Sequence, residues 1–177
     1  LSLFKAIKSI KDIISQEENN YIYVNVASGS KIQAIACMMA CMVLKECDNL
    51  QPFYAEPESY AAFEGKQQSF GIKDTIALPT YEIQTPQPKL LAALKIVSDQ
   101  PNQKITKKEM AQIAEDQKII TINAEQENHS QARFASLDKN IIAPLEKEWK
   151  FIEVEKIGRN RWIKITQEGK DAAEFLL

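Results

Sequence analysis

Residues 21–31 read Tyr-Ile-Tyr-Val-Asn-Val-Ala-Ser-Gly-Ser-Lys, and this stretch decides how the first half of the chain folds. Apart from one asparagine, the run over 21–26 is β-branched or aromatic, which predicts a strand. Small residues follow at 27–30, and a long apolar segment, 32–45, begins directly after Lys31. The pattern therefore predicts a strand, a tight turn and a helix.

The predicted turn has the chemistry of an anion-binding site. Free backbone N–H groups and the positive end of the helix dipole face one point at a helix start. Gly29 lets a ligand approach the backbone, Ser28 and Ser30 supply hydroxyls, and Lys31 adds a charge. The competing interpretation is a plain strand-to-helix turn with Ser30 as its N-cap. The glycine spacing excludes a Walker loop and the dinucleotide fingerprint.

Composition places the chain among ordinary globular proteins. Its 177 residues suffice for one large domain or two small ones, and 45% are hydrophobic and 26% charged. Residues 88–177 carry 15 Lys and Arg against 14 Asp and Glu, so charge alone does not indicate a nucleic-acid binder. No apolar run reaches the ~20 residues of a membrane span, and no signal peptide is evident. We therefore expect a cytoplasmic protein that contacts no membrane.

Three cysteines, Cys37, Cys41 and Cys47, lie in or near the helix predicted after the turn. Cys37 and Cys41 are four residues apart and share one helix face, so we expect small apolar core residues that stay reduced. The single histidine, His129, is far away in the sequence. The sequence therefore predicts no metal site.

The first half has the element order of an α/β fold. Apolar residues at helical spacing predict an amphipathic helix over 2–16. A buried strand of a parallel sheet over 21–26, a helix over 31–46 and a short strand near 52–55 would then make half of a doubly wound sheet. This part of the sequence therefore predicts a partial Rossmann-like sheet.

The stretch between the two halves is harder to interpret. Residues 72–83 favour one or two strands interrupted by Pro79, and Pro86 and Pro88 mark a linker. We place the boundary near residues 85–87. The expected organisation is an α/β domain over 1–86 and a second domain over 87–177.

The second domain begins with three predicted helices. Helical spacing of leucine, isoleucine and valine predicts the first over 90–97. Thr106 and Glu109 form a capping box that opens the second helix. The third begins around 128–130, and Pro144 bends or tightens its end.

A β-hairpin follows the helices. The alternating run 151–157, a turn over 158–161 and a returning run over 162–166 predict two strands with a basic tip. A last helix covers 171–177. Three helices, a hairpin and a closing helix predict a winged helix-turn-helix domain.

In such a domain the third helix enters the major groove of DNA and presents polar side chains to the base edges. Lysines at the start of the second helix suit phosphates, and arginines at the wing tip suit the minor groove or the backbone. The predicted DNA-binding residues are Lys107, Lys108, His129, Ser130, Gln131, Arg133, Ser136, Arg159 and Arg161.

Two alternatives stay open for this domain. It would serve as a protein-interaction module if its charged groups are only a solvated surface, and the weak net charge supports that. Against this, Arg159 and Arg161 repel each other unless a partner neutralises them, which favours DNA. For His129 taken alone, we favour a surface or capping histidine over a ligand or catalytic role.

Residues 25–36, Asn-Val-Ala-Ser-Gly-Ser-Lys-Ile-Gln-Ala-Ile-Ala, resemble the strand-four signature of CARF domains, the CRISPR-associated Rossmann-fold sensors. The order of the domains, with a wing that reads Gly-Arg-Asn-Arg before Ile-Thr-Gln-Glu-Gly, is similar to that of an archaeal family of uncharacterised proteins. In that family a CARF-like domain precedes a winged helix.

The resemblance implies a homodimer that binds a cyclic oligoadenylate or another nucleotide across its interface. The positions that match the ligand-contacting motif are Asn25, Ser28, Gly29, Ser30 and Lys31. The chain departs from the family because the first strands of a CARF domain, which carry another part of the pocket, are absent. The expected ligand site is therefore incomplete.

Together these features predict a dimeric transcriptional regulator that senses a small anionic or nucleotide ligand and binds double-stranded DNA. We expect neither an enzyme nor a resident cofactor. One alternative is a CARF-type nuclease or phosphodiesterase that cuts a cyclic oligoadenylate, but no histidine or evident base lies near the turn. Another is a dimeric protein-interaction module without a ligand.

Overall fold

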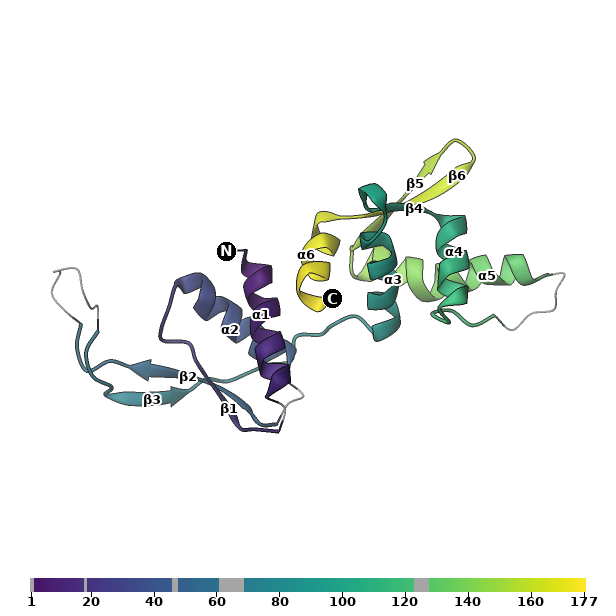
Figure 1. The fold of residues 1–177 in the computed structure, drawn as a ribbon. Coiled ribbons are helices and arrows are strands. Elements are labelled where there is room, and N and C mark those ends of the chain that lie inside the picture. Colours follow the sequence, from purple (N-terminus) through teal and green to yellow (C-terminus); the bar gives the residue numbers. More distant parts are fainter. Residues whose placement is uncertain (1, 18, 46–47, 61–68, 123–127) are drawn as a thin grey trace. The chain divides into compact units, whose positions relative to one another are not determined.

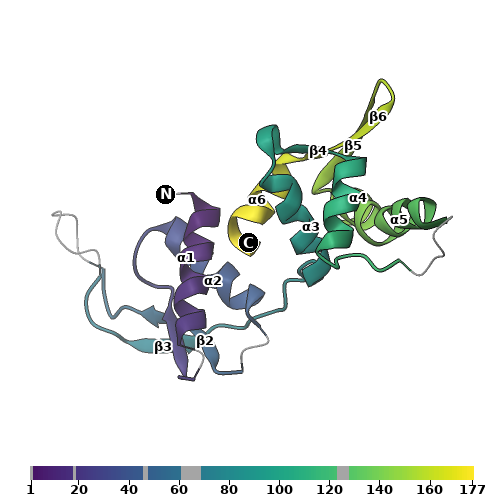
Figure 2. The ribbon, with the colours of Figure 1, turned by 45° about the vertical axis from the view of Figure 1, so that its right-hand side comes forward.

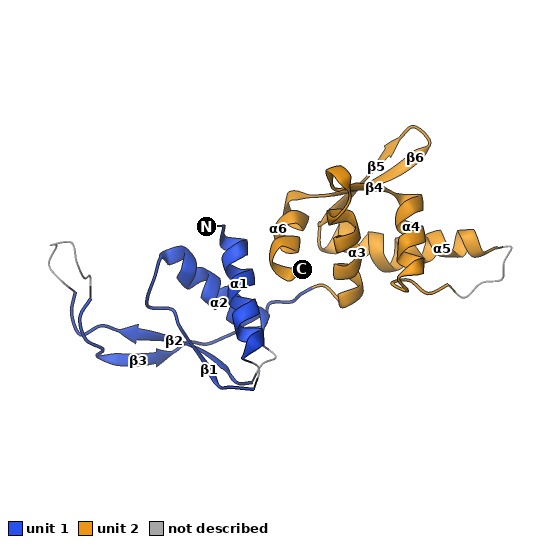
Figure 3. Cartoon of the chain, in the orientation of Figure 1, with its two compact units in different colours: residues 1–85 blue, residues 86–177 orange. Residues whose placement is uncertain are grey.

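The computed structural model describes residues 2–17, 19–45, 48–60, 69–122 and 128–177. The chain divides into two units, residues 1–85 and 86–177 (Figure 3). Each unit contains a three-stranded sheet of its own. Within the described ranges, no helix is both long and apolar enough to cross a membrane.

The first unit is a small α/β arrangement (Figures 1 and 2). Its amphipathic first helix packs against the second through a core that includes Ile7, Ile14, Ala40 and Cys41. In chain order the elements are α1 (Leu3–Gln16), β1 (Ile22–Asn25), α2 (Lys31–Val43), β2 (Leu50–Glu56) and β3 (Asp74–Ala77).

The sheet of this unit is mixed, in the order β1-β2-β3. Strand β1 runs parallel to β2, with Ile22 opposite Leu50, as the strand–helix–strand pattern predicts. Strand β3 is antiparallel to β2 and is a single short strand that ends before Pro79. Three strands with one parallel pair form an α/β sheet, but they do not confirm a CARF-type Rossmann fold.

The prediction that β1 is buried on both faces is wrong within the described residues. Its burial alternates, and the side chain of Tyr23 is 69% exposed while Ile22 and Val24 are half-buried. Tyr21, just before the strand, is 82% exposed. The physical reason is that β1 is an edge strand covered on one face only.

The second unit has three helices, a three-stranded sheet and a closing helix (Figure 1). In chain order its main elements are α3 (Pro88–Ser98), β4 (Lys104–Thr106), α4 (Lys107–Asp116), α5 (His129–Leu137), β5 (Ile152–Ile157), β6 (Asn160–Ile165) and α6 (Gln167–Leu176). The strand order is β4-β6-β5, and both pairings are antiparallel. Helices and sheet share one hydrophobic core, whose fully buried members include Leu94, Met110, Leu137, Ile141, Leu145 and Ile163.

The third helix continues beyond α5 in two π-helical turns, Asp138–Ile142 and Pro144–Glu148. Pro144 has no backbone N–H to donate, so a wider turn at this point loses no hydrogen bond. The N–H of Trp149 donates to the Pro144 carbonyl at 3.0 Å. Leu137, Ile141 and Leu145 of this continued helix lie in the core.

The wing turns within two residues, Gly158 and Arg159, because Ile157 already pairs with Asn160. The predicted four-residue turn over 158–161 is therefore wrong. Gly158 has a φ of +61°, which suits glycine at the first central position of a two-residue hairpin. As a result Asn160 and Arg161 belong to strand β6.

Candidate nucleic-acid interface

Helix α4 starts with the predicted capping box. The Glu109 N–H donates to the Thr106 hydroxyl at 3.2 Å, and the Thr106 N–H donates to the Glu109 carboxylate at 3.1 Å. The Thr106 hydroxyl also donates to that carboxylate at 2.6 Å, and these hydrogen bonds lower the pKa of Glu109. The cap fixes the positions of Lys107 and Lys108 as the first two residues of the helix.

The start of α4 and the wing border one hollow of about 380 Å³. Its lining includes four of the predicted DNA-binding residues, which come from two distant parts of the sequence: Lys107, Lys108, Arg159 and Arg161. Thr106, Phe134 and Asn160 complete it. The structure therefore brings together cations that α4, α5 and strand β5 separate in the sequence.

These cations differ in how far their charge is already compensated. The Lys107 ammonium lies 2.5 Å from the Asp138 carboxylate and 5.6 Å from the centre of the Phe134 ring, and its side chain is only 13% exposed. Lys108, Arg159 and Arg161 are exposed, and the described part of the chain supplies no ion-pair partner for them. Lys107 thus links the start of α4 to the residue after α5. Lys108, Arg159 and Arg161 are available to bind an anionic partner.

A further cation was missed in the sequence. Lys156 on β5 pairs directly with Arg161 on β6, and both side chains are exposed. Like charges opposite each other destabilise a hairpin. The alternation of the strand could have predicted this pair, but only with the length of the turn known.

A second hollow of about 540 Å³ adjoins the first, because both are lined by Thr106, Lys108 and Asn160. Its other lining residues are Glu109, Gln112 and Arg133. Trp162 lies on strand β6 of the wing, and the Lys104 ammonium is 5.0 Å from the centre of its indole ring.

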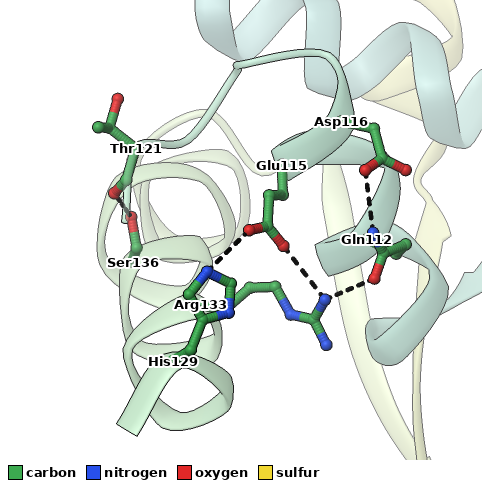
Figure 4. A network of polar contacts seen from close by, with 7 residues as sticks. All are labelled: Gln112, Glu115, Asp116, Thr121, His129, Arg133 and Ser136. Atoms are coloured by element: carbon green, nitrogen blue, oxygen red, sulfur yellow. Dashed lines mark hydrogen bonds and ion pairs between the residues drawn. The ribbon is translucent and has the colours of Figure 1, made fainter. Parts of the chain in front are cut away.

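On α5 the prediction that the polar side chains point outward is wrong for Arg133, which is only 15% exposed (Figure 4). Its Nη1 donates to Gln112 at 2.5 Å and to Glu115 at 3.2 Å, both on α4. His129 Nε2 also lies 3.0 Å from Glu115, and the Ser136 hydroxyl donates to the Thr121 carbonyl at 3.3 Å. Spacings of four and three residues put all three side chains on one helix face, which packs toward α4.

Ser130 and Gln131 of α5 are exposed, in agreement with their predicted place. His129 and Arg133, by contrast, contact Glu115 of α4, and Ser136 contacts Thr121, which follows α4 in the chain. Of the residues predicted on this helix, these two are the ones free to meet a base edge.

The turn before α2 is accounted for by capping. Ser30 is the N-cap: its hydroxyl accepts the Gln33 N–H at 3.3 Å, and its own N–H donates to the Gln33 side chain at 2.8 Å. Asn25 caps the Ala27 N–H at 2.8 Å. Gly29 has a φ of +86°, and a Cβ on it would lie 2.8 Å from the Gln33 side-chain oxygen. The Gln33 carboxamide therefore lies against Gly29, on the side where a Cβ would be.

The other predicted features of this unit can be placed as well. Ser28 and Lys31 are exposed beside the turn. Burial raises the pKa of Cys37 and raises that of Cys41 to about 12, as expected for thiols in an apolar setting; Cys47 lies outside the described residues. Among the residues that the structure describes, no group of three His, Cys, Asp or Glu side chains could hold a metal ion.

Comparison with known proteins identifies a winged helix in the second half of the chain. Residues 89–176 match the family described as "DUF6293 C-terminal winged helix domain", and residues 1–60 match one described as "HFX_2341_N-like, N-terminal". The uncharacterised protein MJ1513 of Methanocaldococcus jannaschii is 29% identical over 129 residues. That match covers 59% of this chain and 38% of the relative, so the chain spans less than half of the relative's length.

The second unit is thus a winged helix domain, and an archaeal protein is among the relatives of the chain. The winged helix suggests DNA binding and a regulatory role. The resemblance of the first unit to CARF domains is not confirmed by these comparisons.

Proposed function

We propose that the winged helix domain binds double-stranded DNA and that the protein regulates transcription. The observation that carries the proposal is the hollow where Lys108, Arg159 and Arg161 meet beside α5. Phosphates supply most of the affinity of such proteins for DNA, and exposed cations at a helix start and a wing are well placed to neutralise them.

The wing supports the proposal independently of the hollow. Lys156 and Arg161 face each other across the hairpin, and Arg159 lies at the turn between them. Three like charges on one hairpin raise its free energy in isolation. A phosphate between them removes the repulsion, so the wing is better suited to a nucleic acid than to plain solvent.

In the proposed complex α5 is the recognition helix. Gln131 pairs with adenine and Ser130 with either type of base in the major groove. Arg159 and Arg161 contact the backbone or the minor groove, and Lys108 holds a phosphate beside the start of α4.

Binding of a fluorescein-labelled 30-base-pair duplex of mixed sequence tests the proposal. We expect the parent protein to bind with an affinity that falls steeply as salt rises, and the double variant R159A/R161A to lose about two units of the log–log salt slope. The matched control is K147A/K170A, which removes two exposed charges that do not line the hollow. Equal affinity and slope for R159A/R161A and the parent would exclude the wing from the interface.

We also propose that the first unit senses a small anionic or nucleotide ligand within a homodimer. The exposed Ser28 hydroxyl and Lys31 ammonium at the start of α2 support this proposal, and the cap formed by Ser30 and Gln33 argues against it. Cyclic tetra-adenylate is the probe: a rise in melting temperature that K31A abolishes supports sensing, and no rise overturns it. Linear products in the same incubation would indicate a phosphodiesterase, and sedimentation gives the oligomeric state.

A further inference from the structure

The junction between α4 and α5 carries an inference that rests on the proposed binding of DNA. Among the described residues, two ion pairs of a lysine or arginine with a carboxylate join the helices. Lys107 at the start of α4 pairs with Asp138 just after α5, and Glu115 in the last turn of α4 pairs with Arg133 of α5. One tie at each end of α4 limits how far the recognition helix can tilt or rotate against it.

Arg133 is the more elaborate of the two ties (Figure 4). Its Nη1 donates to both Gln112 and Glu115, and Gln112 is itself held by a hydrogen bond of 2.9 Å to Asp116. The guanidinium also lies 5.7 Å from the centre of the Phe134 ring. Its planar fork therefore has a defined orientation, which a flexible lysine ammonium would not reproduce.

The surroundings of Arg133 leave little of it for DNA. The side chain is 15% exposed, its Nη1 is occupied, and its Nε is buried without a hydrogen-bond partner among the described residues. Glu115 supplies the opposite charge within 3.2 Å and accepts a second contact from His129. A group that is mostly covered and neutralised in this way acts on a duplex mainly through the geometry of the helix that carries it.

We propose that Arg133 is a positioning residue: through Glu115 and Gln112 it sets the orientation of α5, so that Ser130 and Gln131 reach the base edges. Glu115 is its partner in this role. If Arg133 instead contacted a phosphate and Glu115 only competed for it, E115Q would strengthen binding of the duplex rather than weaken it.

The test compares R133K, E115Q and E109Q with the parent, on the same fluorescein-labelled duplex. R133K keeps the charge and loses the fork. E115Q keeps the shape and loses the charge that holds Arg133. E109Q is the matched control. It removes a negative charge from the hollow of about 540 Å³ that Arg133 also lines, while glutamine preserves a capping box.

If Arg133 positions α5, R133K weakens binding about tenfold with an unchanged salt slope. E115Q also weakens binding, whereas E109Q strengthens it slightly because a repulsive charge has gone. Amide hydrogen exchange over residues 129–137 becomes faster in R133K and E115Q but not in E109Q. Circular dichroism shows that each variant is folded.

Three results overturn the inference: tighter binding by E115Q equal to that of E109Q, unchanged affinity of R133K, or exchange over 129–137 equal to that of the parent. A fourth variant, R133A, removes the charge altogether. If Arg133 contacted a phosphate directly, R133A would lower the salt slope by about 0.9. If the parent does not bind the duplex at all, the proposed function fails; exchange data on the free protein still test whether Arg133 orders α5.

Discussion

Two helix starts in this protein share one design, and they differ in what surrounds them. At α2, Ser30 and Gln33 form a reciprocal cap, and at α4, Thr106 and Glu109 form the same cap. At α4 the wing brings Arg159 and Arg161 to a hollow that already holds Lys108. At α2, Gln33 lies against Gly29, and Lys31 extends into solvent.

The comparison teaches that a capped helix start does not by itself indicate a ligand site. The cap satisfies backbone N–H groups that would otherwise be offered to an anion. What distinguishes α4 is a second element, distant in sequence, that adds charge and encloses space. The following substitutions test this contrast.

The largest expected effect concerns a third capped start, that of α6, where the surrounding space is full. Thr166 accepts the Gly169 N–H at 3.0 Å, and a Cβ on Gly169 would collide with the Phe151 carbonyl oxygen and the Ile165 side chain. We expect G169A to lower the free energy of unfolding by about 3 kcal/mol, because backbone must move to admit one methyl group. Urea denaturation measures the loss. The neighbouring exposed E168A is the control, and equal stability of the two variants would contradict the collision.

A smaller effect comes from a direct comparison of the starts of α4 and α2. K108A should weaken binding of the mixed-sequence duplex about threefold and lower the salt slope by about 0.9, because one phosphate contact is lost. K31A, which removes an exposed charge from the first turn of α2, should change neither quantity in the absence of added nucleotide. Fluorescence anisotropy over a range of salt concentrations measures both. Similar losses in the two variants would show that the wing does not distinguish α4 from α2.

The smallest effect is a dependence on pH that only the cap of α4 should show. Hydrogen bonds from Thr106 lower the pKa of Glu109 in the folded protein below the ordinary value, so the unfolded chain binds this proton more readily. The stabilisation is therefore complete above the ordinary pKa of glutamate and is lost as the pH falls through the lowered value. Gln33 at α2 does not titrate.

Urea denaturation at pH 7 and at pH 3.5 measures this dependence. E109Q should lose less stability between the two pH values than the parent, by a few tenths of a kcal/mol for an exposed group. An identical loss in the parent and E109Q would show that the hydrogen bonds of Glu109 do not depend on its charge.

Local motifs were predicted well from the sequence because their partners lie within a few residues. Thr106 and Glu109 form the expected capping box, and the alternation around Val154 and Ile163 predicts two strands that the structure contains. Parallel pairing of β1 with β2 also follows from the strand–helix–strand order. Each of these needs only propensity and spacing.

Features that depend on distant partners were predicted less well. Arg133 and His129 look like outward-facing groups until α4 supplies Glu115. Lys156 adds to the positive charge of the wing because the strand register places it opposite Arg161. Strand β4 was missed because its three residues are too few to show a pattern in the sequence. The hollow itself was not predicted, because it exists only where two remote segments meet.

The position of Trp162 has a practical consequence. It follows Arg161 on β6, and its indole ring lies beside the Lys104 ammonium. The chain contains two tryptophans, and the other, Trp149, stacks near Phe151 after the second π-helical turn. Replacing Trp149 with phenylalanine would leave Trp162 at the wing as the single tryptophan, and its emission, excited selectively, would report occupancy of that edge without any attached dye.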